Sequence, residues 1–411
     1  MSYIKPFSYD DFLTYKIQDG DTPESVAKNL DIDLYSLRSY HNRYCESVED
    51  CIGPVFPRHL KFVIIKPPVV QLIDEEKEQQ RNKVVFNDSP GKLSLNYSHG
   101  EKKYAVLCTI ENGKDVHSIK QQIKISWQAE NAGFHFYYVS RDEALYVNDT
   151  ATNTMAQEIA QKASQALYPL LIVVDESGKW VYVNNYDQIV ERWHETKKQI
   201  RKYYKGDQTE KYFKIYDKNL ADEDSLFLSI QKDWFLNALF NEIHVQYPQD
   251  LSLKKHISFP HLHNTKSIQY LVNQKIDEHL DTDNLILIDI IGKLDDSRTK
   301  TDFQNELNHP VKEYSDEKAG GNYMAKYYLN PNSYMPEAFI VSADLELDIP
   351  QKYTVTATHL DTATELVIAS RQPLFVSGTA IKTKSGNSFW YLLFTILIFV
   401  ALIYAISKLY T

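Results

Sequence analysis

The alternation of hydrophobic and polar positions predicts a small folded module over residues 12–68. Apolar residues alternate at 15–17 and again at 60–64, which is typical of two short strands. Between them, apolar positions three or four residues apart predict one helix over 26–30 and a second over 34–40. The predicted order is strand, helix, helix, strand. The residues expected in the core are Val26, Ala27, Leu37 and Ile64.

The long middle of the chain carries mixed patterns that predict two further domains. Residues 69–92 are polar and predict a linker. Residues 93–260 combine strand patterns, an Ala-rich helix and helices with broad apolar faces, so we expect a central α+β domain. A hairpin is predicted around the turn at 175–178. Over residues 261–376, apolar runs separated by Gly and Pro turns predict a mainly-β domain.

The last pattern is an unbroken, uncharged apolar run over residues 389–406, preceded by a polar linker at 377–388. As a helix the run would be roughly 27 Å long, which is close to the hydrocarbon thickness of a bilayer. The residues expected at its ends, near the membrane surface, are Phe389, Trp390, Tyr391, Tyr404 and Lys408. The predicted fold class is therefore α+β multidomain, with the N-terminal module, a central α+β domain, a mainly-β third unit and a single C-terminal transmembrane helix.

Charges near the apolar run favour a cytoplasmic body. Arg371, Lys382 and Lys384 precede the run, whereas Lys408 alone follows it. The start of the chain has no cationic cluster leading into an apolar stretch, so no secretory signal peptide is expected. The expected localisation is a single-pass membrane protein with a C-terminal anchor and a cytoplasmic body.

The composition narrows the possible functions. The formal net charge of -10 gives no positive field for nucleic acid, so no nucleic-acid partner is expected. With 43% hydrophobic and 13% aromatic residues, the chain is expected to be largely folded. It has only three cysteines, a number typical of proteins in a reducing compartment.

Residues 12–68 resemble the LysM family, whose core is Tyr-x-Val-x-x-Gly-Asp-Thr-Leu-x-x-Ile-Ala. The residues that match this pattern in register are Tyr15, Ile17, Gly20, Asp21, Thr22, Val26 and Ala27. The resemblance implies a strand-helix-helix-strand fold and binding of N-acetylglucosamine-containing glycans, in a shallow groove between two loops. By the same resemblance, the groove residues are Gly20, Asp21, Thr22, Pro23, Ile52, Gly53 and Pro54.

Departures from the family pattern favour a second use of the module. Pro23 replaces the usual Leu, and the second loop, residues 42–59, is longer than usual. The usual Pro-Gly-Gln before the last strand is replaced at 57–59. Because a lengthened loop can fill or reshape a shallow groove, protein contact competes with glycan binding. We expect weak or absent affinity for chitin-type oligosaccharides.

A search for chemistry yields no catalytic residue, metal site or cofactor. His41, Cys45, Cys51 and His59 are ligand types that zinc prefers, but they lack a Cys-x-x-Cys pair. No phosphate-binding glycine loop or dinucleotide fingerprint is present. His261, His263 and the acidic segment 277–281 are solvated loop residues by default. The protein is therefore expected to be non-enzymatic.

Three functions fit this sequence. The first is a membrane-anchored bacterial binding or adaptor protein of the envelope, which contacts a protein partner or a glycan through the LysM-like module. The second is a structural component or membrane-inserting effector of a contractile, phage-tail-like or type VI secretion system, because LysM-like modules also occur there. The third and weakest is a cell-wall hydrolase, which would need a catalytic constellation that the sequence does not show.

Overall fold

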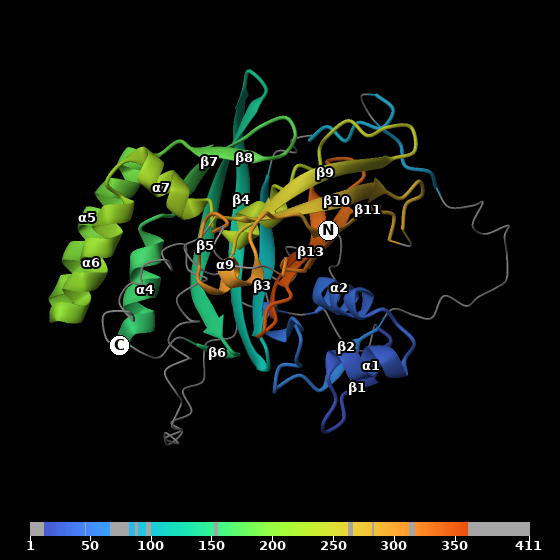
Figure 1. The fold of residues 1–411 in the computed structure, drawn as a ribbon, viewed down its shortest axis with the longest axis horizontal. Coiled ribbons are helices and arrows are strands. Elements are labelled where there is room, and N and C mark those ends of the chain that lie inside the picture. Colours follow the sequence, from blue (N-terminus) through green and yellow to red (C-terminus); the bar gives the residue numbers. More distant parts are fainter. Residues whose placement is uncertain are drawn as a thin grey trace, which may run out of the picture.

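A large antiparallel sheet and a small N-terminal module form the part of the chain that the computed structural model describes (Figure 1). The described residues are 12–45, 47–65, 82–86, 89–95, 100–151, 155–261, 266–281, 283–311 and 317–360.

The N-terminal module contains two strands and two helices in the order expected from the pattern. These elements are β1 (Thr14–Lys16), α1 (Pro23–Asn29), α2 (Leu34–Tyr44) and β2 (Phe62–Ile64), with a short 3-10 helix η2 (Val48–Asp50) in the long second loop. Strands β1 and β2 pair antiparallel. The four residues expected in the core, Val26, Ala27, Leu37 and Ile64, are all buried, as predicted. Gly20 lies in the turn after β1 with a φ of 87°, a conformation that favours glycine.

The large sheet has twelve strands within the described residues, and all of its pairings are antiparallel. Its first half comprises β3 (Glu101–Asn112), β4 (Asp115–Asn131), β5 (Phe134–Val147), β6 (Thr150–Ala151), β7 (Leu170–Val174) and β8 (Trp180–Val183). Its second half comprises β9 (Ser252–Phe259), β10 (Ile268–Ile276), β11 (Ile286–Leu294), β12 (Asn322–Leu329), β13 (Pro336–Leu345) and β14 (Gln351–His359). The spatial order is β8-β7-β5-β4-β3-β14-β13-β12-β11-β10-β9, with β6 beside β5.

The predicted fold class is wrong, because the central and third units are not separate. Strand β14 pairs along its whole length with β3, from Gln351 opposite Asn112 to His359 opposite Tyr104. This pairing joins the two halves of the chain into one sheet. The expected boundary at 260/261 also falls between β9 and β10, which pair from Phe259 opposite Ile268 onward. Separate strand runs in a sequence do not show whether they share a sheet, since the pairing is long-range.

The sheet curves around a short buried helix, α8 (Trp234–Leu239). Phe235 contacts Tyr104 of β3 and Phe339 of β13, with ring centroids 5.9 and 6.1 Å apart. At the sheet's far end, Trp234 lies 6.4 Å from Phe259 of β9. Since strands from the middle and the edge of the sheet contact the same helix, α8 lies in the concave face and belongs to the main hydrophobic core.

Among the described residues, four further helices lie between the N-terminal module and α8. They are α4 (Met155–Gln165), α5 (Tyr186–Tyr203), α6 (Asp207–Asn219) and α7 (Glu223–Ile230), and a short helix α9 (Lys300–Gln304) follows β11. Figure 1 shows α4, α5 and α6 grouped on one side of the sheet, and the N-terminal module on the other. The apolar positions between 226 and 239 lie in α7 and α8, which are separated by a turn because Asp233 caps α8 through its side chain.

The pattern missed the strands β4 and β9. Strand β4 is the longest in the sheet, yet its sequence is rich in Lys, Gln and Ser. Strand β9 contains Lys254, Lys255 and His256. It is an edge strand, where charged residues oppose pairing with other chains. Sheet strands that carry so many polar residues lack the enrichment in β-branched and aromatic residues that identifies strands in a sequence.

The described residues contain no helix that is both long and apolar enough to cross a membrane. The run at 389–406, with Phe389, Trp390, Tyr391, Tyr404 and Lys408, lies outside the described residues, as does the linker before it. The transmembrane part of the predicted fold class therefore has no counterpart among the described residues.

Candidate functional site

A cavity of about 700 Å³ opens between the two edges of the curved sheet. Its walls come from the start of β8, the helices α7 and α8, the edge strand β9 and the segment that leads into β10. Among the described residues that line it, the cationic side chains are Lys179, Lys232, Lys266 and, when protonated, His256, and the carboxylate is Glu242. Its side-chain amides are Gln231, Asn237, Asn241, Gln269 and Asn308. Its apolar wall is formed by Trp180, Leu228, Phe240 and Ile257.

The segment after α8 fixes one wall of this cavity. Asn241 is buried, and its side-chain amide donates hydrogen bonds to the hydroxyls of Tyr323 (2.9 Å) and Tyr327 (2.8 Å) of β12. The Tyr327 hydroxyl in turn donates to the carbonyl of Ala238, at 2.6 Å. These hydrogen bonds attach the end of α8 to β12, so the sheet fixes the position of this cavity wall.

Two lysines bind the same segment from the sheet's two edges. Lys179, just before β8, forms an ion pair with Glu242 at 2.5 Å. Lys255 of β9 donates through Nζ to the carbonyls of Glu242 (2.6 Å) and Asn241 (3.4 Å). Burial lowers the pKa of Lys255 to about 8. The segment thus bridges the edges of the sheet where they approach each other.

The turn of the β7–β8 hairpin is positioned by a close approach between a glycine and a histidine. A Cβ atom on Gly178, whose φ is 79°, would lie 2.4 Å from Nδ1 of His244, so a larger residue does not fit. The backbone N–H of His244 donates to the carbonyl of Ser177 at 3.1 Å, and its Nε2 lies 3.0 Å from the carbonyl of Tyr334. Burial lowers the pKa of His244 to about 4, so the ring is neutral at pH 7 and Nε2 carries the proton that this carbonyl accepts.

Lys232 lies in the turn between α7 and α8 and lines the cavity. Burial lowers the pKa of its ammonium group to about 8. A cation that has lost much of its hydration gains most from an anion brought beside it. With the amides and the apolar wall, the cavity therefore has the features that bind an organic anion: a positive group, hydrogen-bonding groups and a surface for an apolar body.

The first loop of the LysM-like module uses its characteristic residues to build its own turn. Asp21 accepts hydrogen bonds from the Tyr15 hydroxyl (3.1 Å) and the backbone N–H of Gln18 (2.8 Å). Thr22 caps α1 by accepting from the N–H of Ser25 at 3.1 Å, and Pro23 is buried as the first residue of the helix. These side chains are thus engaged in the fold, and Gly20 and Thr22 are exposed beside them.

The second loop packs between the module core and strand β3 of the large sheet. Ile52 is fully buried in the module core. A Cβ on Gly53 would lie 3.2 Å from the Thr109 hydroxyl and 3.4 Å from a methyl of Leu107, so β3 covers this residue. Pro54 is half-buried. The two halves of the expected glycan groove therefore have different surroundings, since the first is exposed and the second is covered by strand β3.

The interface between the module and the sheet explains the length of this loop. An apolar cluster joins the two parts and consists of Cys45, Val48, Cys51, Ala105, Leu107 and Leu360. Polar contacts surround it: Arg43 pairs with Asp283 at 2.5 Å, and the buried Lys120 of β4 donates to the carbonyl of Glu49 and pairs with Asp149 at 2.8 Å. The extra loop residues thus form a docking surface.

The four zinc-type residues of the module do not gather around one point. His41 donates through Nε2 to the carbonyl of Asp50 at 3.1 Å and accepts through Nδ1 from the N–H of Ile64 at 3.0 Å. The sulfurs of Cys45 and Cys51 lie 3.7 Å apart, and His59 lies 2.9 Å from the Asp50 carboxylate. Across the described residues, no three His, Cys, Asp or Glu side chains are placed to hold a metal ion.

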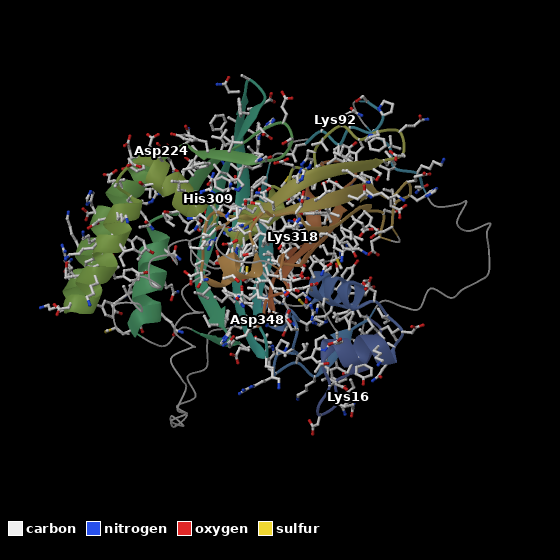
Figure 2. The ribbon with its side chains drawn as sticks, viewed as in Figure 1. Lys16, Lys92, Asp224, His309, Lys318 and Asp348 are labelled. Atoms are coloured by element: carbon white, nitrogen blue, oxygen red, sulfur yellow. The ribbon has the colours of Figure 1, made fainter. Side chains whose placement is uncertain are left out.

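The other candidate residues are also separate from the cavity. His261 is buried and bonded to Gln351 (3.1 Å) and the Tyr353 hydroxyl (3.2 Å), whereas His263 lies outside the described residues. In Figure 2, Asp224 of α7 and His309, the neighbour of the cavity residue Asn308, lie far from Lys16 of the module. Sequence reasoning missed the cavity, because its residues come from five segments and form no local motif.

Comparisons with known proteins do not assign a family. No model of a known protein family matches the chain, and no curated protein sequence matches it. Among solved structures, the chain is similar to one described as "Lipid-protein interactions in lipovitellin", with a TM-score of 0.34 and 9% identity. The match covers 71% of this chain and 27% of that chain, and it is too distant to carry an argument about fold or function. The LysM resemblance thus has no support beyond its matching residues. No comparison supports a role at a membrane, at peptidoglycan or in a secretion system.

Proposed function

We propose that the protein is a non-enzymatic binding protein whose cavity between the sheet edges holds a small organic anion. The observation that carries this proposal is the meeting of Lys179, Lys232 and Lys266 with five side-chain amides around about 700 Å³ of space. Pockets of this size suit small-molecule ligands. Each charge-assisted hydrogen bond to a ligand carboxylate or phosphate would stabilise the complex by about 1.5–3 kcal/mol.

The apolar wall defines the rest of the ligand. Trp180, Phe240 and Ile257 are almost completely buried, so they form a well-packed part of the cavity wall. Trp180 is held edge-on against Phe227 of α7, with ring centroids 5.5 Å apart. An anion that carries an aromatic or aliphatic body would also cover Leu228, the exposed apolar residue of the lining, whereas inorganic phosphate would leave it exposed to water.

Calorimetric titration of the full chain at pH 7 tests this proposal. Phenyl phosphate should bind more tightly than inorganic phosphate, because only phenyl phosphate covers the apolar wall. Changing Lys232→Gln should weaken its binding by about 10- to 100-fold, from the loss of one charge-assisted contact. The matched control Lys254→Gln alters an exposed lysine on β9 outside the cavity and should leave binding unchanged. Equal affinity of the wild type and Lys232→Gln for phenyl phosphate would refute the proposal.

For the N-terminal module, we propose protein contact in place of glycan binding. The support is the cover that β3 provides for Gly53, together with the use of Asp21 and Thr22 in the turn of the first loop. Titrating the full chain with N-acetylglucosamine oligomers should give no saturation at micromolar ligand. Saturable micromolar binding that is lost on changing Thr22→Ala would restore the glycan reading of the module.

A further inference from the structure

One buried arginine holds the segment that leads into β10. Arg298 lies in the loop between β11 and α9 and is 2% exposed. Its guanidinium donates to the carbonyls of Lys266 and Ser267, each at 3.0 Å. Both of these residues line the cavity. A single side chain outside the lining therefore fixes two consecutive residues of the cavity wall.

A buried carboxylate holds the arginine in turn. Asp296 accepts from Nε of Arg298 at 2.9 Å and from a terminal guanidinium nitrogen at 2.7 Å, and both side chains are almost completely buried. Asp296 also accepts from the backbone N–H of Gln269, a third lining residue, at 3.2 Å. Because the cost of removing two charges from water offsets most of their attraction, a buried ion pair adds little net stability. Its consequence here is geometric, since the pair fixes the backbone of the lining segment 266–269.

The same arginine contacts the other side of this part of the cavity. Its guanidinium stacks on the ring of Phe303 in α9, 4.4 Å from the ring centroid. The chain that follows α9 leads to Asn308, whose side-chain oxygen accepts from the backbone N–H of Lys266 at 2.7 Å. Asn308 also lines the cavity. Lys266, Ser267 and Asn308 thus form one fixed part of the lining, which we call the Lys266 corner.

The Lys266 corner carries a positive charge that is available to a ligand. Lys179, another cation of the lining, is paired with Glu242 at 2.5 Å. Lys266 is exposed, and no carboxylate among the described residues forms an ion pair with its ammonium group. Because the side-chain oxygen of Asn308 is used by the backbone of Lys266, the amide nitrogen of Asn308 remains as a donor for the same ligand.

We propose that the Lys266 corner supplies a second charged contact for the anionic group of the ligand, and that Arg298 is the positioning residue of this contact. This inference rests on the proposed anion binding, in which Lys232 supplies the first contact. Arg298 does not touch the ligand. It acts through Lys266, because it holds the backbone from which the ammonium group reaches the cavity.

Calorimetric titration of the full chain with phenyl phosphate tests the contact. Lys266→Gln should weaken binding by about 10-fold, from the loss of one charge-assisted hydrogen bond. Asn308→Asp keeps the oxygen that accepts from Lys266 but adds a negative charge, so it should weaken binding at least as much. The control Asn148→Asp should leave binding unchanged, since it makes the same change outside the cavity, at an exposed asparagine whose oxygen accepts from the N–H of Ser118. Wild-type affinity in Asn308→Asp would overturn the inference.

A double-mutant cycle tests the role of Arg298. Arg298→Lys keeps the charge but loses the planar fork that binds two carbonyls and a carboxylate at once. It should weaken phenyl phosphate binding by about 5-fold in the otherwise unchanged chain and by less than about 2-fold in the Lys266→Gln background. Equal weakening in both backgrounds would assign Arg298 a general structural role and refute the positioning role.

Hydrogen exchange of the wild type gives a second readout, which does not depend on how well a variant folds. Bound phenyl phosphate should slow exchange at residues 266–269 and leave exchange in the N-terminal module unchanged. Unchanged exchange at 266–269 in the complex would overturn the inference. If phenyl phosphate does not bind the wild type, both proposals fail. If Lys232→Gln weakens binding while Lys266→Gln does not, this inference alone fails and the proposed anion binding stands.

Discussion

The N-terminal module and the cavity between the sheet edges differ in how their sequences relate to their structures. In the module, the matching residues Tyr15, Asp21 and Thr22 are close in sequence and bond to one another or to adjacent backbone. In the cavity, Lys179, Lys232 and Lys266 come from distant segments and belong to no motif. The recognisable sequence pattern of the module therefore specifies its fold. The ligand-binding features of the cavity come instead from residues that the tertiary structure brings together.

The two regions also differ in what covers their polar groups. The second loop of the module lies against β3, and the groups at its interface are paired, such as Arg43 with Asp283. The cavity opens to water and places cations and amides around a free volume. Changes in the module should therefore affect stability, and changes in the cavity should affect binding.

The largest effect is expected from a variant that unfolds the module, because it tests whether module stability and cavity binding are independent. Val26→Asp places an unpaired charge at a fully buried position and should destabilise the module by more than about 3 kcal/mol. Hydrogen exchange should show loss of protection in α1 and α2, while phenyl phosphate still binds the cavity. The control Lys28→Asp alters an exposed position of the same helix and should leave protection intact. Protected α1 amides in Val26→Asp would disprove the proposed core.

Acid should weaken both regions in parallel. Burial lowers the pKa of His41 in the module and of His244 beside the cavity to about 4 each, below the usual 6.5. The folded state therefore disfavours protonation, and the stability from each neutral ring is full above pH 6.5 and is lost as the pH falls toward 4. Each histidine should account for about 3 kcal/mol over this window.

Urea unfolding measured between pH 7.5 and 4 checks this expectation. Replacing His41→Asn should flatten the pH dependence of hydrogen-exchange protection in the module. The pH dependence of protection in β7 and β8 should stay unchanged. A pH-independent free energy of unfolding in the wild type would contradict the neutral state assigned to both rings.

A smaller effect is expected where the two parts of the molecule meet. Gly53→Leu adds a side chain that must displace Thr109 or Leu107, so the module should dock less tightly, at a cost of about 1–3 kcal/mol. Hydrogen exchange at 45–52 should increase. The control Val55→Leu adds volume at a half-exposed position nearby. Unchanged exchange in the Gly53 variant would argue against the packed interface.

The smallest effect should come from the characteristic threonine of the first loop. Thr22→Ala removes the side-chain cap of α1 and should destabilise the module by about 1 kcal/mol. The midpoint of module unfolding in urea measures this loss. Phenyl phosphate affinity should not change, since Thr22 does not line the cavity. A change in that affinity would show that the two regions are coupled.

The sequence predicted local structure better than it predicted architecture. The module core and the β7–β8 hairpin follow from spacing, and their residues lie where the pattern placed them. The single sheet was not predictable, because the β3–β14 pairing joins residues far apart in the chain. Strands β4 and β9 are too polar to be identified from apolar alternation. Of the cavity, no residue was predicted, since Lys232 and Asn241 look like ordinary surface residues until the sheet curves around α8.

The central claim is that the cavity binds an organic anion beside Lys232, and the pH dependence of that binding tests it most directly. An anion favours the charged amine, whose pKa in the free protein is lowered to about 8 by burial. Calorimetry with phenyl phosphate, above the range in which its phosphate titrates, should show affinity that falls as the pH rises from 7.5 to 9.5, and Lys232→Gln should remove most of this dependence. Affinity that is independent of pH over this range, or a fall that persists in full in Lys232→Gln, would contradict the account.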